Sequence, residues 1–175
     1  VYVDSDWGGD VSSRRSTSGG LIMLGNHILN HWCKAQSTIS LSSGEAELNA
    51  AVKGITEAIG AIELLRELRI EVKTKVMMAS NVGKGILLRK GVGSMKHLSI
   101  KQLWVQSAIP EYDIEVVKVP RQANVVDLLT RACDKREFAE HLNKLSIVRP
   151  SWYGTNKAEE GCRNTQSYFG RGFEA

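Results

Sequence analysis

The sequence has 175 residues and a formal net charge of +4, with 42% hydrophobic and 24% charged residues. This length and composition are typical of one globular domain and exclude a disordered chain or a fibrous repeat. The longest apolar runs, such as residues 21–24, are far too short to cross a bilayer, so we expect no membrane partner. The positive charge permits a polyanionic partner without requiring one.

The cysteines predict the cellular compartment of the chain, and the first residues predict that it is part of a longer protein. Three widely spaced cysteines do not form a disulfide framework, so we expect a reducing intracellular compartment, cytoplasmic or nuclear. The sequence begins at Val1 without an initiator methionine or a signal peptide, and its first residues have the pattern of a strand. We therefore expect a piece of a longer protein.

The first third of the sequence predicts three consecutive strands. Residues 1–7 alternate apolar and polar side chains, residues 21–24 are apolar, and residues 28–33 return after the turn residues Gly25 and Asn26. Short connections of this kind join neighbouring antiparallel strands. We therefore expect an antiparallel meander at the start of the domain.

A long helix follows the meander. Ser42 and Glu45 have the spacing of a capping box, which satisfies free backbone N–H groups at a helix start. An apolar stripe and a row of small residues then recur at helical spacing up to about Arg69. Because small side chains allow a close approach, we expect this helix to pack centrally against the sheet.

The remaining elements alternate between strands and helices. We expect a strand at 75–79, a helix at 82–89, a helix at 98–109 ended by Pro110, a strand at 114–119, and one interrupted helix at 124–132 and 136–145. This order predicts an α/β fold with a mixed sheet, whose later strands are joined by helical crossovers. Residues 1–147 form the predicted domain, and residues 148–175 are expected to be a low-order C-terminal tail.

Acidic residues near strand and helix ends are candidates for metal ligands, because hard divalent cations need converging oxygen atoms. Asp4 and Asp6 share a face of the first strand, Glu47 lies near the start of the long helix, and Asp127 lies near the start of the C-terminal helix. A carboxylate in a first helical turn more often compensates the helix dipole. The spacing of these acids in the sequence alone therefore favours compensation of the helix dipole over metal binding.

Five sequence blocks occur together in one order: YVDSDWGGD, RRSTSG, KAQSTISLSSGEAELNA, MKHLSIKQLWVQ and VPRQANVVDLLTRA. In these blocks the sequence resembles the ribonuclease H domain of copia-type LTR retrotransposon Pol polyproteins, over roughly residues 1–147. The resemblance implies a ribonuclease H-like fold with a five-stranded mixed sheet flanked by helices. It also implies an upstream reverse transcriptase region in the same polyprotein and an RNA–DNA hybrid as substrate.

The resemblance implies a reaction and its ligands as well. In this family four carboxylates hold two Mg²⁺ ions, which activate the attacking water and stabilise the leaving oxygen when the RNA strand is cleaved. The first, second and fourth carboxylates correspond to Asp4, Glu47 and Asp127, and Asp6 accompanies the first without being a core ligand.

The third carboxylate is missing from this sequence. Where the family has Asp followed by Asn, the chain has Ser80 and Asn81, and the nearest acids are Glu71 and Glu111. A neutral hydroxyl is a poor ligand for Mg²⁺ beside carboxylates. We therefore expect low metal occupancy and severely reduced or absent cleavage. The family motif KHID is also changed, to KHLS at residues 96–99.

Residues 72–110 contain seven Lys and Arg and no Asp or Glu, as expected for a phosphate-contacting surface. The candidate substrate-binding residues are Arg14, Arg15, Lys84, Arg89, Lys96 and His97. These basic residues could equally be a solvated face, and Trp104 within the segment is expected in the core. The alternative to an enzyme is a catalytically inactive nucleic-acid-binding remnant of the same fold.

Overall fold

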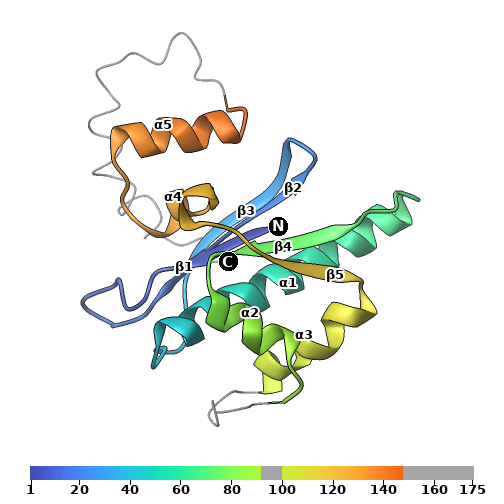
Figure 1. Cartoon of the computed structure of the whole chain (residues 1–175), viewed down its shortest axis with the longest axis horizontal. Helices are drawn as coiled ribbons and strands as arrows, with labels where there is room; N and C mark the ends of the chain where they lie inside the picture. The colour runs from blue at the N-terminus through green and yellow to red at the C-terminus, as the bar shows by residue number, and fades with distance from the viewer. Residues whose placement is uncertain (92–99, 148–175) are drawn as a thin grey trace, which may run out of the picture. The chain divides into compact units, whose positions relative to one another are not determined.

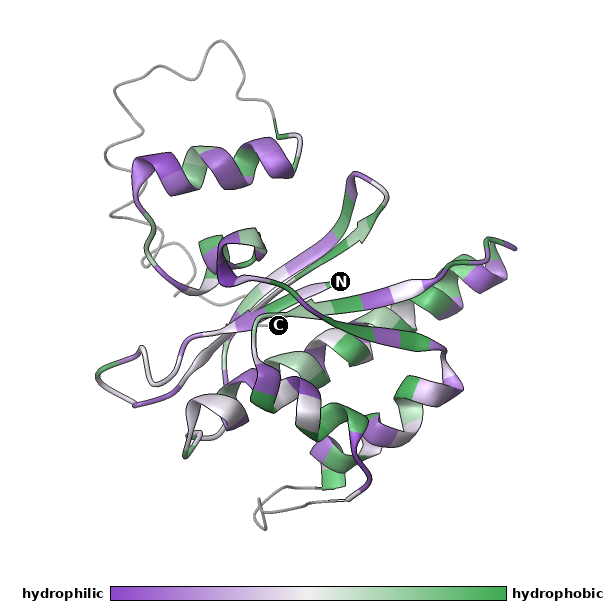
Figure 2. Cartoon of the chain, viewed as in Figure 1, coloured by the Kyte–Doolittle hydropathy of each residue, from purple (hydrophilic) through white to green (hydrophobic). Residues whose placement is uncertain are grey.

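The computed structural model describes residues 1–91 and 100–147. The chain divides into two compact units, Val1–Arg131 and a second that begins at Ala132. The second unit contains the mostly hydrophilic helix α5 (Lys135–Lys144), whose first turn is capped by the side chain of Asp134 (Figure 2). The boundary that we predicted after residue 147 falls where the described residues end, and it remains a prediction.

The first unit is built on a five-stranded mixed sheet. Its strands are β1 (Tyr2–Ser5), β2 (Thr17–Leu24), β3 (His27–Ala35), β4 (Thr74–Met78) and β5 (Ile114–Lys118). They lie in the order β3-β2-β1-β4-β5, antiparallel from β3 to β1 and parallel from β1 to β5. The predicted α/β fold with a five-stranded mixed sheet flanked by helices is confirmed, and this architecture is that of a ribonuclease H-like fold.

Helices cover both faces of this sheet. They are α1 (Ser43–Glu67), α2 (Asn81–Leu88), α3 (Ile100–Glu111) and α4 (Asp127–Thr130), which follows a 3₁₀ turn at Arg121–Ala123. In Figure 1, α1, α2 and α3 lie on one side of the sheet and α4 on the other. None of the described helices is long and apolar enough to cross a membrane.

Three expectations about the helices were wrong. Residues 124–145 do not form one interrupted helix, because α4 ends at Thr130 in the first unit and α5 belongs to the second. Pro110 does not end α3, since a proline in the last turn removes only one hydrogen bond and the helix continues to Glu111. Trp104 is not in the core, because its side chain is 45% exposed.

Helix α1 begins as its capping residues predict and packs closely on the central strand. The Ser42 hydroxyl accepts a hydrogen bond from the backbone N–H of Glu45, and the Glu45 carboxylate accepts one from the N–H of Leu41. At Gly54 the helix is so close to β1 that an added Cβ would lie 2.2 Å from Val3 Cγ1. The row of small residues on α1 therefore sets the spacing between helix and sheet.

This contact predicts opposite effects for two glycines of the same helix. Gly54→Ala should lower the free energy of unfolding by about 1–3 kcal/mol, because the new methyl group overlaps Val3. Gly60 is exposed with no atom near its Cβ position, so Gly60→Ala should raise the stability by about 0.5–1 kcal/mol. Chemical denaturation measures both changes, and a Gly54→Ala protein as stable as Gly60→Ala would refute the close packing.

Candidate functional site

Asp4 lies in the middle of the sheet, on the face opposite to α1. Its neighbour Val3 points to α1, and side chains alternate along a strand, so Asp4 points towards α4. The carboxylate is only 6% exposed and accepts a hydrogen bond from the hydroxyl of Thr130 on α4. The central strand thus connects the hydrophobic core on one face with a buried acid on the other.

Two features fix α4 over this acid. Gly19, the β2 residue paired with Asp4, allows the close approach, because a Cβ there would lie 2.7 Å from Thr130 Cγ2 and 2.9 Å from Val126 Cγ1. The buried Asn124 donates from its side-chain amide to the backbone carbonyl of Val3 at 2.9 Å. The segment before α4 is therefore attached to the central strand itself.

Asp127 is the first residue of α4 and is 1% exposed. Its Oδ2 accepts hydrogen bonds from Arg131 Nη2 at 2.7 Å and Nε at 3.1 Å, and lies 3.5 Å from Arg121 Nε. Its Oδ1 is buried and receives no hydrogen bond from the described residues. One side of the carboxylate is thus neutralised by arginine, and the other has no partner there.

Glu47 projects from the second turn of α1. Its Oε2 is also buried without a hydrogen-bond donor among the described residues. The start of α1 is held to the sheet by Gln36, whose side-chain amide donates to the carbonyl of Ala46 and to the hydroxyl of Ser18, both at 2.9 Å. This buried polar contact fixes the position of Glu47 relative to β2.

The pKa values of Asp4 and Glu47 are both raised, and Asp127 contributes to each change. Burial, opposed by the Thr130 hydroxyl and reinforced by Asp127, raises the pKa of Asp4 to about 6. Burial, together with the charges of Asp4 and Asp127, raises the pKa of Glu47 to about 8, although Arg121 opposes the change. The structure thus places Asp4, Glu47 and Asp127 within electrostatic reach of one another.

Ser80 lies at the same edge of the sheet but does not add an acid. It follows β4, which runs parallel to β1, so the carboxyl ends of both strands meet at this edge. Its hydroxyl accepts a hydrogen bond from the backbone N–H of Gly83 at 3.0 Å and caps α2. The side chain at which the resemblance places the third carboxylate therefore caps a helix.

The described residues do not fit a centre for two Mg²⁺ ions. Among residues 1–91 and 100–147, no three His, Cys, Asp or Glu side chains are arranged to hold a metal ion. Two arginines already neutralise Asp127 on one side, and Ser80 supplies no charge. The unpartnered oxygens of Glu47 and Asp127 still form an acidic site, but its set of ligands is incomplete for two dications.

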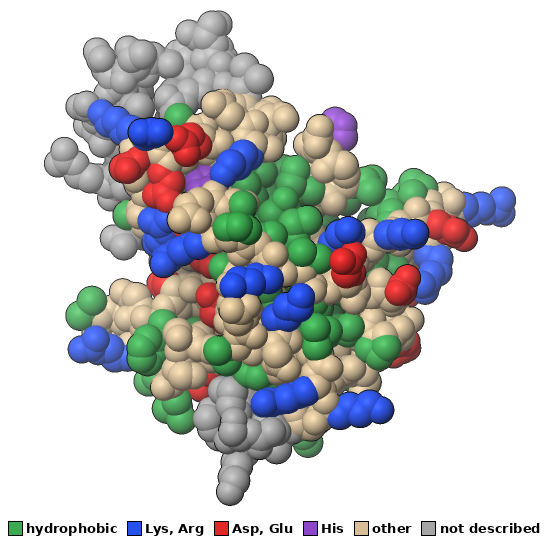
Figure 3. Space-filling view, viewed as in Figure 1, with side chains coloured by type: hydrophobic (Ala, Val, Ile, Leu, Met, Phe, Trp, Pro, Cys, Tyr) green, Lys and Arg blue, Asp and Glu red, His purple; other side chains and the backbone are tan. Residues whose placement is uncertain are grey.

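The candidate substrate-binding residues are spread over several elements. Arg14 and Arg15 are exposed in the loop between β1 and β2, whereas Lys84 on α2 and Arg89 at its end are half-buried. Lys96 and His97 lie outside the described residues. On the face seen in Figure 3, Lys and Arg side chains are separated by apolar and acidic ones. Their role in binding remains a prediction.

Comparisons with known proteins agree with this architecture. The chain is 29% identical over 152 residues to the retrovirus-related Pol polyprotein from transposon RE1 and 28% identical over 152 residues to that from transposon RE2, both of Arabidopsis thaliana. It is 26% identical over 139 residues to the one from transposon TNT 1-94 of Nicotiana tabacum. These matches cover 85%, 85% and 78% of the chain. The chain is homologous to copia-type Pol polyproteins.

The chain represents a small part of such a polyprotein. It spans about 10% of the length of each of these three relatives. No protein-family model matches it. The relatives therefore support a Pol-derived domain, and the activities of a whole polyprotein do not follow from them.

Sequence reasoning predicted these three acids as site residues, which stays a prediction, but it missed the residues that hold them in place. Thr130, Asn124 and Gln36 act through contacts between distant segments, which no local pattern indicates. Arg131 had a local signal, since it lies four residues after Asp127, the spacing of a helical ion pair.

The raised pKa of Glu47 predicts how stability depends on pH. Between its ordinary value of 4.5 and about 8, the folded chain binds more protons at Glu47 than the unfolded chain does, so this group lowers the stability as the pH rises. Glu47→Gln removes the charge and should raise the thermal midpoint near pH 8, with little effect near pH 4.5.

Thermal unfolding followed by circular dichroism at both pH values measures this difference. Glu67→Gln, at the exposed end of the same helix, is the matched control and should not change the pH dependence. An equal effect of Glu47→Gln at both pH values would contradict the raised pKa.

Proposed function

We propose that the chain is the ribonuclease H-type domain of a retrotransposon Pol polyprotein, in which cleavage of the RNA strand of RNA–DNA hybrids is severely reduced. The observation that carries this proposal is the set of side chains near the carboxyl ends of β1 and β4. Three mutually repelling carboxylates lie there, while Ser80 caps a helix at the place of the third family acid.

The charges of the site support the loss of activity. When bound, two Mg²⁺ ions would supply an activated water and a stabilised leaving oxygen. Only the carboxylates of Asp4, Glu47 and Asp127 would face them, and Arg121 and Arg131 compete for Asp127. With one negative charge fewer, the site would neutralise two dications incompletely, so metal occupancy and hydrolysis would both fall.

A catalytically inactive nucleic-acid-binding domain is the second candidate function. It is favoured by the acid-free segment at residues 72–110 and by Arg14 and Arg15, which are exposed in the loop between β1 and β2. Phosphate contacts by these side chains need no metal ion, and the binding constant would fall steeply with salt. Binding of an RNA–DNA hybrid in EDTA, without cleavage when Mg²⁺ is restored, would identify this function.

Substitution of Ser80 tests the proposed loss directly. The unaltered chain should cleave an RNA–DNA hybrid slowly or not at all in Mg²⁺, and Ser80→Asp should increase the rate by about 100-fold or more, because a restored metal ligand contributes several kcal/mol to transition-state stabilisation. Aspartate is as good a helix cap as serine, so α2 should remain intact. Cleavage of labelled hybrid on a denaturing gel gives the rate.

Ser80→Asn is the matched control, because asparagine also caps a helix but carries no charge. It should leave the rate at the level of the unaltered chain. Rapid cleavage by the unaltered chain would overturn the proposal, and so would equal rates for the Asp and Asn variants.

A further inference from the structure

Arg121 is the more exposed of the two arginines that face Asp127. Its side chain is 67% exposed and that of Arg131 is 33% exposed, whereas the side chain of Asp127 is 1% exposed. Arg131 donates two hydrogen bonds to Asp127 Oδ2, at 2.7 and 3.1 Å, but Arg121 approaches the same oxygen only to 3.5 Å. Arg131 therefore satisfies this oxygen, and Arg121 is an additional positive charge at the surface of the site.

The terminal nitrogens of Arg121 have no partner within residues 1–91 and 100–147. Its contact with Asp127 is made by Nε, and neither Nη group donates a hydrogen bond to another described residue. A guanidinium group presents several N–H groups in one plane, and two of them can bind two oxygens of one phosphate. Arg121 can thus remain next to Asp127 through Nε and bind an anion through its Nη groups.

The backbone of Arg121 is fixed relative to the acids. Arg121 begins the 3₁₀ turn after Pro120, and its carbonyl accepts a hydrogen bond from the N–H of Asn124 at 2.9 Å. The side-chain amide of Asn124 donates to the carbonyl of Val3, the residue before Asp4. Because the turn is attached to the central strand, little backbone freedom would be lost when Arg121 binds a ligand.

A nucleic acid that approaches these acids needs a positive charge beside them. Its phosphates are repelled by ionised carboxylates and attracted by arginine side chains. The pKa values of Asp4 and Glu47 are raised chiefly by burial, and the charge of Arg121 opposes both changes. The guanidinium group of Arg121 is therefore within electrostatic reach of both acids while it is exposed to solvent.

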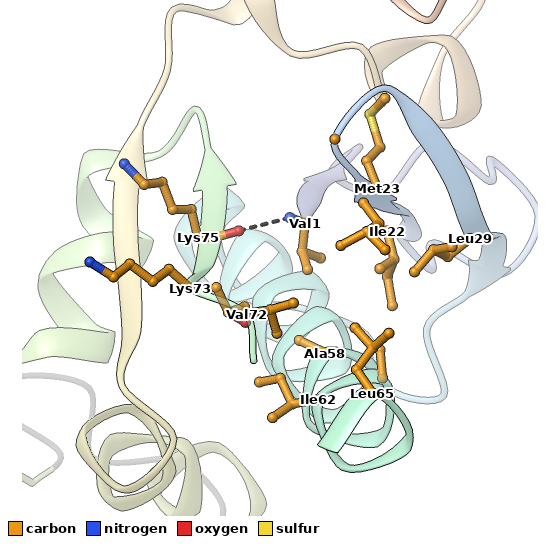
Figure 4. A pocket seen from close by; sticks show the side chains of 14 residues that line it. Val1, Ile22, Met23, Leu29, Ala58, Ile62, Leu65, Val72, Lys73 and Lys75 are labelled. Atoms are coloured by element: carbon orange, nitrogen blue, oxygen red, sulfur yellow. Dashed lines mark hydrogen bonds between the residues drawn. The ribbon is translucent and has the colours of Figure 1, made fainter. Parts of the chain in front are cut away.

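The cavity of about 250 Å³ in Figure 4 does not compete for such an anion. It is lined by Thr74 at the beginning of β4, whereas the acids lie near the carboxyl end of that strand. Its wall includes apolar side chains such as Ile62 and Leu65, and the side chains of Lys73 and Lys75 extend away from it. A phosphate inside it would lose its hydration without gaining a charged partner.

We propose that Arg121 binds a backbone phosphate of the RNA–DNA hybrid through its Nη groups, beside Asp4, Glu47 and Asp127. Arg121 is a positioning residue, which holds the strand next to the acids and takes no part in bond cleavage. The contact needs no metal ion, so it is compatible with both candidate functions. The proposal rests on the proposed function, because it takes the hybrid as the ligand.

Removal of the Arg121 charge tests this contact. In EDTA, Arg121→Gln should lower the binding constant for a labelled RNA–DNA hybrid about tenfold and make the slope of log K against log[NaCl] less steep by about 1, as expected for one lost phosphate contact. Arg121→Lys keeps the charge and should keep the slope. Fluorescence anisotropy with the whole 175-residue chain measures both quantities.

Arg66→Gln is the matched control. The side chain of Arg66 is 64% exposed and also pairs with one carboxylate, that of Glu63, in the last turns of α1. This variant should leave the binding constant and the slope unchanged. An unchanged slope for Arg121→Gln would overturn the proposal even if its thermal midpoint fell, because a residue that only compensates the acids affects stability alone.

Hybrids that carry one neutral methylphosphonate at a time distinguish a direct contact from a long-range effect of charge. At one backbone position, the neutral linkage should weaken binding by the unaltered chain and by Arg66→Gln, but should not weaken binding by Arg121→Gln further. Additive losses at every position would overturn the contact. Failure of the unaltered chain to bind the hybrid would overturn the proposed function as well, whereas binding that Arg121→Gln leaves unchanged would overturn this inference alone.

Discussion

Burial of the carboxylates of Asp4 and Glu47 beside one another and beside Asp127 is the constraint on which this end of the sheet depends. Burial and neighbouring acids raise the pKa of Asp4 and Glu47, and two arginines hold one oxygen of Asp127. Such an arrangement costs stability unless protons or cations compensate the charge. The carboxylates cannot move apart to relieve this cost, because each lies on an element that the rest of the fold holds in place.

The central strand makes this attachment possible. One face of β1 packs on α1 through Val3 and Gly54, and the other presents Asp4 to Thr130 of α4. A change in the distance between α1 and β1 would therefore shift Asp4 together with the core. The core and the acidic site thus meet on one short strand.

Local signals in the sequence predicted most of this fold. The Ser42 cap, the small residues of α1 and the alternation of the strands act over a few residues, and they correctly predicted α1 and the mixed sheet. The short helix α4 was predicted as part of a longer one, because its position depends on Gly19 and Asn124 contacting distant segments. The three acids came from a family resemblance. Their pKa values and arginine partners required the structure.

In the proposed function, Ser80 is the residue that separates this domain from a complete two-ion site. Its hydroxyl caps α2, so the helix keeps its start while the site lacks a charge. Titration of Mg²⁺ into the unaltered chain and into Ser80→Asp, followed by isothermal calorimetry, tests this claim most directly. The account predicts weak or no binding by the unaltered chain and tighter binding by Ser80→Asp. Tight binding of two ions by the unaltered chain would contradict it.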